Sequence, residues 1–198
     1  MGFHHLTRHG LVAGAIGLLT ACSSVYYSAL EKVGLEKREI LVDRVESARD
    51  AQGKAQEQFK DALERFQALV GTDGGELEKR YEALSGEYDD SRSQAEAVRE
   101  RIAAVKDVAG ALFREWEKEL EEYSDPSLKR RSRSQLDDTR ARYDLLVRAM
   151  DRAAASMDPV LAMLHDQTLF LKHNLNARAL GSLTGTADQL QADVARLV

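Results

Sequence analysis

The sequence predicts an all-α protein: an elongated antiparallel three-helix coiled-coil bundle with a short C-terminal helix, preceded by a cleaved signal peptide. Apolar residues recur at alternating spacings of three and four along three long stretches, as in coiled coils. Breaks with glycine or proline separate these stretches. The composition agrees, because 31% of the residues are charged and only 2 are proline, which is typical of long helices.

The organisation expected is a signal peptide over residues 1–21 and one helical coiled-coil domain over residues 22–198. A chain of this length ordinarily forms a single domain. The helices are expected at about 25–70, 76–123, 126–175 and 186–197.

The first 21 residues have the composition of a signal segment. Residues 1–10 contain Arg8 and no acidic residue, and residues 11–19 are apolar. That apolar run is too short to span a hydrocarbon core of about 30 Å, but it suits a signal peptide. The sequence Leu19-Thr20-Ala21-Cys22 then resembles the bacterial lipobox. The alternative is a structural cysteine after an ordinary signal or membrane segment.

The lipobox resemblance implies that the Cys22 thiol accepts a diacylglyceryl group and that cleavage makes Cys22 the first mature residue. It further implies three acyl chains, and two or more chains hold a protein durably on a membrane. Ser23 and Ser24 follow, with no aspartate beside the cysteine. By the sorting rule of Gram-negative lipoproteins, this pattern resembles that of proteins placed on the periplasmic side of the outer membrane, in preference to the inner membrane.

Each predicted long helix carries its own heptad pattern. The first consists of Leu41, Val45, Ala48, Gln52, Ala55, Phe59, Ala62, Phe66 and Leu69. The second consists of Leu77, Tyr81, Leu84, Tyr88, Ser91, Ala95, Val98, Ile102, Val105, Ala109, Leu112 and Trp116. The third consists of Leu136, Thr139, Tyr143, Leu146, Met150, Ala153, Met157, Val160 and Leu164.

The breaks have the chemistry of helix ends. Glycines at 71–75 are typical of the end of the first helix, and Asp73 is expected to be the N-cap of the second. Ser124-Asp125-Pro126 supplies the next N-cap, with proline at the first helical position. Short turns make neighbouring helices antiparallel. With helices of equal length, we expect the Asp125-Pro126 turn beside the membrane and residues 165–185 at the distal tip. Pro159, inside the third pattern, predicts a kink.

The charge and residue types exclude several functions. A net charge of −5 argues against nucleic-acid binding, which needs a basic stripe. We find no Ser-His-Asp set, phosphate-binding loop or clustered metal ligands, so no catalytic residue, metal or cofactor is expected. His165 and His173 are the only histidines after the signal segment. They are expected to be polar packing residues in preference to ligands.

Two surfaces are candidates for binding. The possible partner-binding tip consists of Thr72, Asp73, Lys172, His173, Asn174 and Asn176. The possible contact with lipid headgroups consists of Lys129, Arg130, Arg131 and Arg133. Basic residues beside an anionic membrane are attracted to its phosphates. The alternatives are that amides near the C-terminus cap a helix and that the basic run is a solvated helix start.

Two stretches resemble a known family. They are Tyr26-Tyr27 through Gly34 to Lys37-Arg38-Glu39-Ile40-Leu41-Val42-Asp43-Arg44-Val45, and His165-Asp166-Gln167-Thr168-Leu169-Phe170-Leu171-Lys172-His173-Asn174-Leu175-Asn176-Ala177. Together they resemble an uncharacterised family of proteobacterial lipoproteins, the domain-of-unknown-function family 2959. The resemblance covers the mature chain and implies a helical lipoprotein, without indicating any activity.

The function expected from these observations is that of a lipid-anchored periplasmic scaffold or interaction protein of the cell envelope, without catalytic activity. It would be attached to the membrane through the lipid on Cys22 and would bind a protein partner in the envelope. The alternative is a ligand-binding module with a small cavity between helices near Pro159.

Overall fold

The computed structural model describes residues 27, 36–70, 77–173 and 184–197. Cys22, Thr72, Asp73, Asn174 and Asn176, among the residues singled out above, lie outside this part. The described elements are α2 (Lys37–Val70), α3 (Leu77–Glu119), the 3-10 turn η1 (Leu120–Glu122), α4 (Pro126–Ala155), α5 (Asp158–His173) and α7 (Thr184–Leu197). Within these ranges there is no β-strand, and the predicted all-α class is confirmed.

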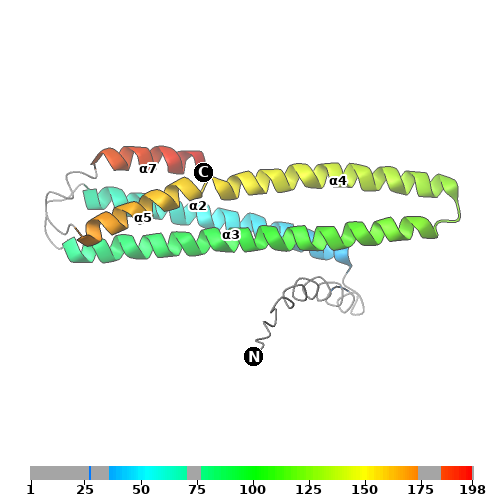
Figure 1. Ribbon diagram of the computed structural model, residues 1–198, viewed down its shortest axis with the longest axis horizontal. Helices are drawn as coiled ribbons and strands as arrows, with labels where there is room; N and C mark the ends of the chain where they lie inside the picture. The colour runs from blue at the N-terminus through cyan, green and yellow to red at the C-terminus, as the bar shows by residue number, and fades with distance from the viewer. Residues whose placement is uncertain (1–26, 28–35, 71–76, 174–183, 198) are drawn as a thin grey trace, which may run out of the picture.

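Helix α3 is the longest of the described helices, and α2, α4 and α5 pack along it (Figure 1). Helices α4 and α5 follow one another antiparallel to α3. Three contacts fix this register: Trp116 with Ser132, Lys106 with Asp151, and Arg99 with Asp158. Helix α2 packs extensively on another side of α3. The helices therefore form an elongated antiparallel bundle, as the heptad patterns predict.

One half of the bundle is a four-helix head formed by α2, α3, α5 and α7. Its apolar core includes Phe59 and Phe66 from α2, with Leu164 from α5. The last helix, α7, packs on α2 and α5 and buries Leu190, Val194 and Leu197. The side chain of Gln56 donates a hydrogen bond of 3.1 Å to the carbonyl oxygen of Leu197. The C-terminal helix is thus an integral part of the head.

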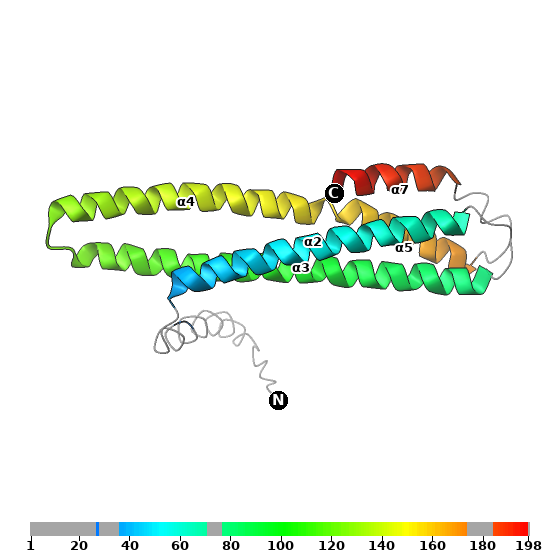
Figure 2. The same cartoon turned by 180° about the vertical axis from the view of Figure 1, so that it is seen from behind.

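The other half is a hairpin of α3 and α4 that extends past the beginning of α2 (Figure 2). The ammonium group of Lys37, the first residue of α2, lies 2.9 Å from the Glu115 carboxylate. The last turn of α3, η1 and the first turns of α4 lie beyond that point. The expectation of three helices of equal length is therefore wrong, because Glu36 is not helical and α2 begins only at Lys37.

The start of α4 follows the predicted capping chemistry. Asp125 has extended backbone angles, and its carboxylate accepts a hydrogen bond of 2.7 Å from the backbone N–H of Ser127. Pro126 occupies the first turn, where its missing N–H costs nothing. The predicted N-cap is confirmed.

Pro159 ends a helix instead of bending it. Helix α4 stops at Ala155, Ser156 and Met157 form a turn, and α5 begins at Asp158. Proline lacks an N–H, and its ring clashes with the carbonyl of the residue four positions earlier, here Ala155. In the first turn of a new helix the same residue is tolerated. The single third helix with a kink is therefore two helices, with the buried Met157 at the junction.

One position of the third heptad pattern lies outside the seam. Leu146 is expected in the seam but is 38% exposed, whereas Val147 is half-buried and Ala154 is buried. The positions that follow, Met150, Ala153 and Met157, are again buried or half-buried, so the pattern keeps its phase and Leu146 is a single exception.

Candidate functional site

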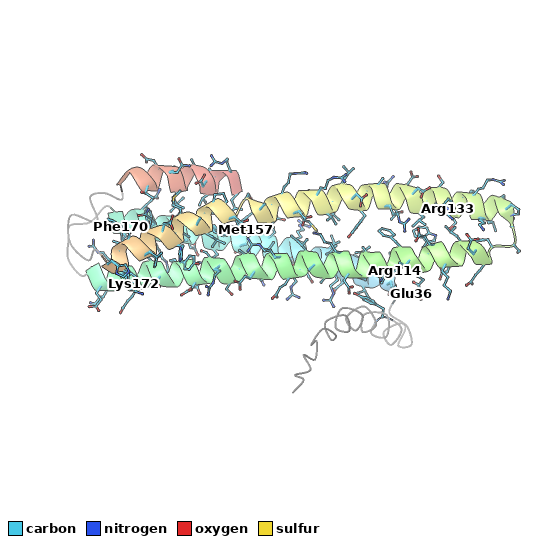
Figure 3. All side chains as sticks on the ribbon, viewed as in Figure 1. Glu36, Arg114, Arg133, Met157, Phe170 and Lys172 are labelled. Atoms are coloured by element: carbon cyan, nitrogen blue, oxygen red, sulfur yellow. The ribbon has the colours of Figure 1, made fainter. Side chains whose placement is uncertain are left out.

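The predicted basic run lies at the closed end of the hairpin, opposite the end where Phe170 and Lys172 lie (Figure 3). Glu121 neutralises two of its members: the Lys129 ammonium group lies 2.7 Å away and the Arg133 guanidinium 3.8 Å away. Arg130 and Arg131 are exposed, and neither has an ion pair with the rest of the described chain. The run therefore offers two unpaired cations to an anionic ligand, instead of the four expected.

Apolar side chains stand beside these cations. Tyr123 and Leu128 are both exposed at the hairpin turn. With Arg131, Ser132 and Gln135 they line a shallow cavity of about 440 Å³. A guanidinium between an aromatic ring and an aliphatic side chain is the combination found where proteins meet a membrane interface.

Aromatic and ionic contacts between α3 and α4 hold the hairpin closed. The indole N–H of Trp116 donates a hydrogen bond of 2.8 Å to the Ser132 hydroxyl. The rings of Phe113 and Tyr143 meet edge to face at 5.3 Å. Arg140 lies over the Phe113 ring and donates to the Glu117 carboxylate at 2.7 Å. These bulky partners build a separate small core at the hairpin.

The cations and hydrogen-bond donors at the hairpin end lower the pKa values of three carboxyl groups. The Arg140 guanidinium lowers the pKa of Glu117, and the Lys129 ammonium group lowers the pKa of Glu121. Hydrogen bonds from Ser127 lower the pKa of Asp125. The ionised forms of all three groups are thus favoured by the closed hairpin.

We expect acid to loosen the hairpin before it unfolds the head. A carboxyl group whose pKa is lowered by folding contributes stability above its unfolded pKa, and this contribution is lost as the pH falls through the lowered value. For Glu117 and Glu121 the loss therefore begins below the ordinary value of 4.5. Trp116, the one tryptophan of the chain, lies in the hairpin. Its fluorescence should shift to the red on titration to about pH 3, before the far-ultraviolet circular dichroism changes.

The double variant Glu117→Gln with Glu121→Gln is the matched control for that titration. It keeps the shape of both side chains and removes their charges, so its Trp116 emission should change less in the same range. An identical acid transition in the parent and the double variant would contradict the assignment.

The second candidate surface lies at the end of α5. Lys172 and His173, predicted for the partner-binding tip, are exposed there, next to the exposed Leu169 and Phe170. His165 lies one to two turns earlier and packs against the ring of Tyr88 at 5.2 Å. Among the described residues no three His, Cys, Asp or Glu side chains gather as metal ligands.

Tyr27, the first residue that the structure describes, packs on the side of the elongated bundle. The Tyr27 hydroxyl donates a hydrogen bond of 2.7 Å to the Asp107 carboxylate, and its buried ring packs with Ile40, Val108 and Ala111. The hairpin turn lies about 24 Å farther along α3, at 1.5 Å per residue. Five residues, the separation of Cys22 and Tyr27, span at most about 18 Å. Cys22 lies outside the described residues, so the expected position of the Asp125-Pro126 turn beside the membrane stays a prediction.

A buried carboxylate in the head was not anticipated. Glu87 is 4% exposed, forms an ion pair with Arg65, and accepts a hydrogen bond of 3.0 Å from Gln58. The sequence gives little indication that Glu87 is buried. It lies one position before the heptad residue Tyr88, and two further acidic residues follow. This polar contact fixes the register of α2 on α3.

The cavities of the described chain are shallow. One of about 260 Å³ lies between α2 and α3 and is lined by Arg65, Ala68, Leu69, Arg80, Ala83 and Leu84. Another, of about 590 Å³, lies where α2 begins beside Glu115 and Trp116. Neither these nor the cavities at the hairpin end have Pro159 in their lining, and Pro159 itself is exposed. None of the described helices is long and apolar enough to cross a bilayer.

Comparison with known proteins gives one result. The family described as "Protein of unknown function (DUF2959)" matches residues 26–198. No curated protein and no solved structure matches the chain. The match spans the helical head and the hairpin together, and the chain belongs to the DUF2959 family.

Proposed function

We propose that this protein is a lipid-anchored scaffold of the cell envelope, held on the periplasmic side of the outer membrane through Cys22. It would bind another envelope protein with one end. The observation that carries the proposal is that each end of the elongated bundle exposes two large apolar side chains. Tyr123 and Leu128 lie at the hairpin end, and Leu169 and Phe170 lie at the far end of the head.

The two ends suit different partners. At the hairpin, Arg131 lines a cavity with Tyr123 and Leu128, and Arg130 is exposed next to it in the sequence, which favours a lipid surface with anionic headgroups. Each cation near such a surface contributes on the order of 1 kcal/mol, and salt weakens it. At the head, Leu169 with Lys172 forms a mixed apolar and basic patch on a rigid helix, which favours a protein partner.

The position of Tyr27 determines how the anchored rod would lie. Its contact with Asp107 places Tyr27 about two thirds of the way along α3. The hairpin end can then touch the headgroups only if the rod is inclined to the membrane. The basic residues would therefore tilt the hairpin end of the rod toward the membrane.

Cross-linking in cells tests the partner-binding end. A photoreactive amino acid at Leu169 should give a discrete adduct with an envelope protein, and Lys172→Glu should weaken that adduct by reversing the local charge. The matched control carries the photoreactive residue at Glu57, which is exposed on α2. The same adducts from both positions, or none from Leu169, would count against the proposed role of the head end.

A further inference from the structure

The outward face of α4 is basic, although the protein as a whole is acidic. Its arginines lie on the side of α4 that points away from the buried core residue Leu136, since steps of four, seven and eleven residues return to one side of a helix. All of them are exposed, and none forms an ion pair within the described chain: Arg130, Arg131, Arg142, Arg148 and Arg152. Asp138 is the one acid in this row. Because guanidinium groups bind carboxylates and phosphates, this arginine face fits an anionic partner.

The outward face of α2 has the opposite charge. Its acids lie opposite the core residues of α2, are exposed, and form no ion pair within the described chain: Glu39, Asp43, Glu46, Asp50, Glu57, Asp61 and Glu64. Lys54 is the one cation in this row. Helix α7 packs beside this acidic face through Gln56 and Gln67 and leaves the acids exposed. Since α2 has 34 residues and α4 has 30, the two faces are similar in length.

The two faces have matching charge spacings when one helix is reversed. Counting backward along α4, a cation, an acid and a cation follow one another at steps of four and seven residues: Arg142, Asp138 and Arg131. Counting forward along α2, an acid, a cation and an acid follow at the same steps: Asp50, Lys54 and Asp61. Each charge of one helix is therefore inverted at the corresponding position of the other.

We propose that copies of this chain associate side by side, with the arginine face of one α4 antiparallel on the acidic face of α2 in the next copy. When Asp138 lies opposite Lys54, the last residue of α4, Ala155, lies opposite the first residue of α2, Lys37. Each arginine then lies within about two residues, or about 3 Å along the helix, of an acid of the next copy. The pairs are Arg130 with Glu64, Arg131 with Asp61, Arg142 with Asp50, Arg148 with Glu46, and Arg152 with Glu39.

The charges at the edges of the contact agree with this arrangement at one point and oppose it at another. Asp144 would lie opposite Arg49, and both are exposed and form no ion pair within the described chain. Lys60 would lie near Arg133, which is a like charge. The Glu121 carboxylate already lies 3.8 Å from the Arg133 guanidinium, which reduces this repulsion.

A parallel arrangement pairs fewer of the arginines. With Asp138 again opposite Lys54, Arg152 would lie opposite Ala68, four residues beyond the last acid of the face. Arg130 and Arg131 would then share one acid, Glu46. The antiparallel arrangement gives every arginine an acid of its own.

The contact joins two different surfaces of the chain. Figure 2 shows α2 across the front of α3 and α4 above it, so the outward faces of α2 and α4 point in different directions. Such a heterologous contact leaves a free face on each outer copy, so it adds further copies and forms a ring or an open array. Exposed ion pairs are individually weak and are screened by salt. The association therefore depends on several pairs acting together and should decrease as salt is raised.

Cross-linking between paired cysteines tests the arrangement. A chain with Arg130→Cys and Glu64→Cys should give a ladder of dimers and larger oligomers with a short thiol-specific cross-linker. The matched control combines Arg130→Cys with Glu46→Cys, which lies 18 residues or about 27 Å from Glu64 on the same face. It should give about ten times less product. Both chains are tested in cells and as purified Cys22→Ser protein without lipid, so the result does not depend on the anchor or on headgroups that compete for Arg130.

Charge exchange gives a second measurement. Arg142→Glu should reduce the ladder of the Arg130→Cys, Glu64→Cys chain several-fold, and adding Asp50→Arg to the same chain should restore it. Equal cross-linking by the Glu46→Cys control overturns the proposal, because it would indicate a parallel arrangement or random collision. So does a chain that remains monomeric. If that monomer binds vesicles with anionic lipid and Arg142→Glu weakens the binding, the arginine face belongs to lipid headgroups instead.

Discussion

Replacing Cys22 with serine is expected to abolish lipid attachment completely. The lipid is joined to a thiol, and a serine hydroxyl is not an acceptor for that modification. Cys22 is the one cysteine of the chain, so no other residue can take its place. Metabolic labelling with a clickable fatty acid measures the result directly, and membrane fractionation should show the variant released from the pelleted envelope or retained as the unprocessed precursor.

The control for this substitution is Ser23→Ala, which changes the next residue and keeps the thiol. It should incorporate the label as the parent chain does. Undiminished label on the Cys22→Ser protein would refute the anchor, and with it the proposed attachment to the outer membrane.

Replacing Phe59 with alanine is expected to destabilise the folded state by about 3–5 kcal/mol. Phe59 has no exposed surface and packs in the core that α2, α3, α5 and α7 share. The substitution removes most of an aromatic side chain and leaves a cavity that the surrounding helices can close only in part. Urea unfolding followed by circular dichroism gives the free energy of unfolding.

Val42→Ala is the matched control on the same helix. Val42 is 55% exposed, and substitutions at such surface positions usually change stability by no more than about 0.5 kcal/mol. Similar unfolding midpoints for Phe59→Ala and Val42→Ala would show that the head core is not packed as described. Because α3 runs through both halves, Trp116 fluorescence also tests whether the hairpin unfolds together with the head.

The sequence predicts the seam of the first two helices well. The heptad positions of α2, from Leu41 to Leu69, are all buried or half-buried, as are those of α3 from Tyr81 to Trp116. A repeat of apolar residues records which side of a helix is buried, so this information is local and can be read directly. The turn residues also fix the N-cap at Asp125.

The relative lengths and the helix break could not be obtained in the same way. A heptad pattern continues through Pro159 although the helix does not, because Val160 and Leu164 return to the same core after the turn at Met157. The pattern also includes Leu146, which is 38% exposed. Both differences depend on how tightly α4 and α5 pack on α3, which is a tertiary property.

At the candidate site, composition located the basic run but not its partners. The ion pair of Lys129 with Glu121 crosses the hairpin turn, and it leaves Arg130 and Arg131 as the unpaired members. The bond from Tyr27 to Asp107 joins residues far apart in sequence. Neither contact has a periodic signal. Each depends on the register between helices, which single residues do not encode.

In the proposed anchored protein, the contact of Tyr27 with Asp107 on α3 has a mechanical consequence. A tether fixed at this point of a stiff rod makes a lever with two unequal arms. The arm from Asp107 to the beginning of α3 at Leu77 is about 45 Å long, and the arm to the hairpin turn is about 24 Å, at 1.5 Å per residue. A load on the head therefore moves the hairpin end the opposite way, with roughly half the travel and twice the force.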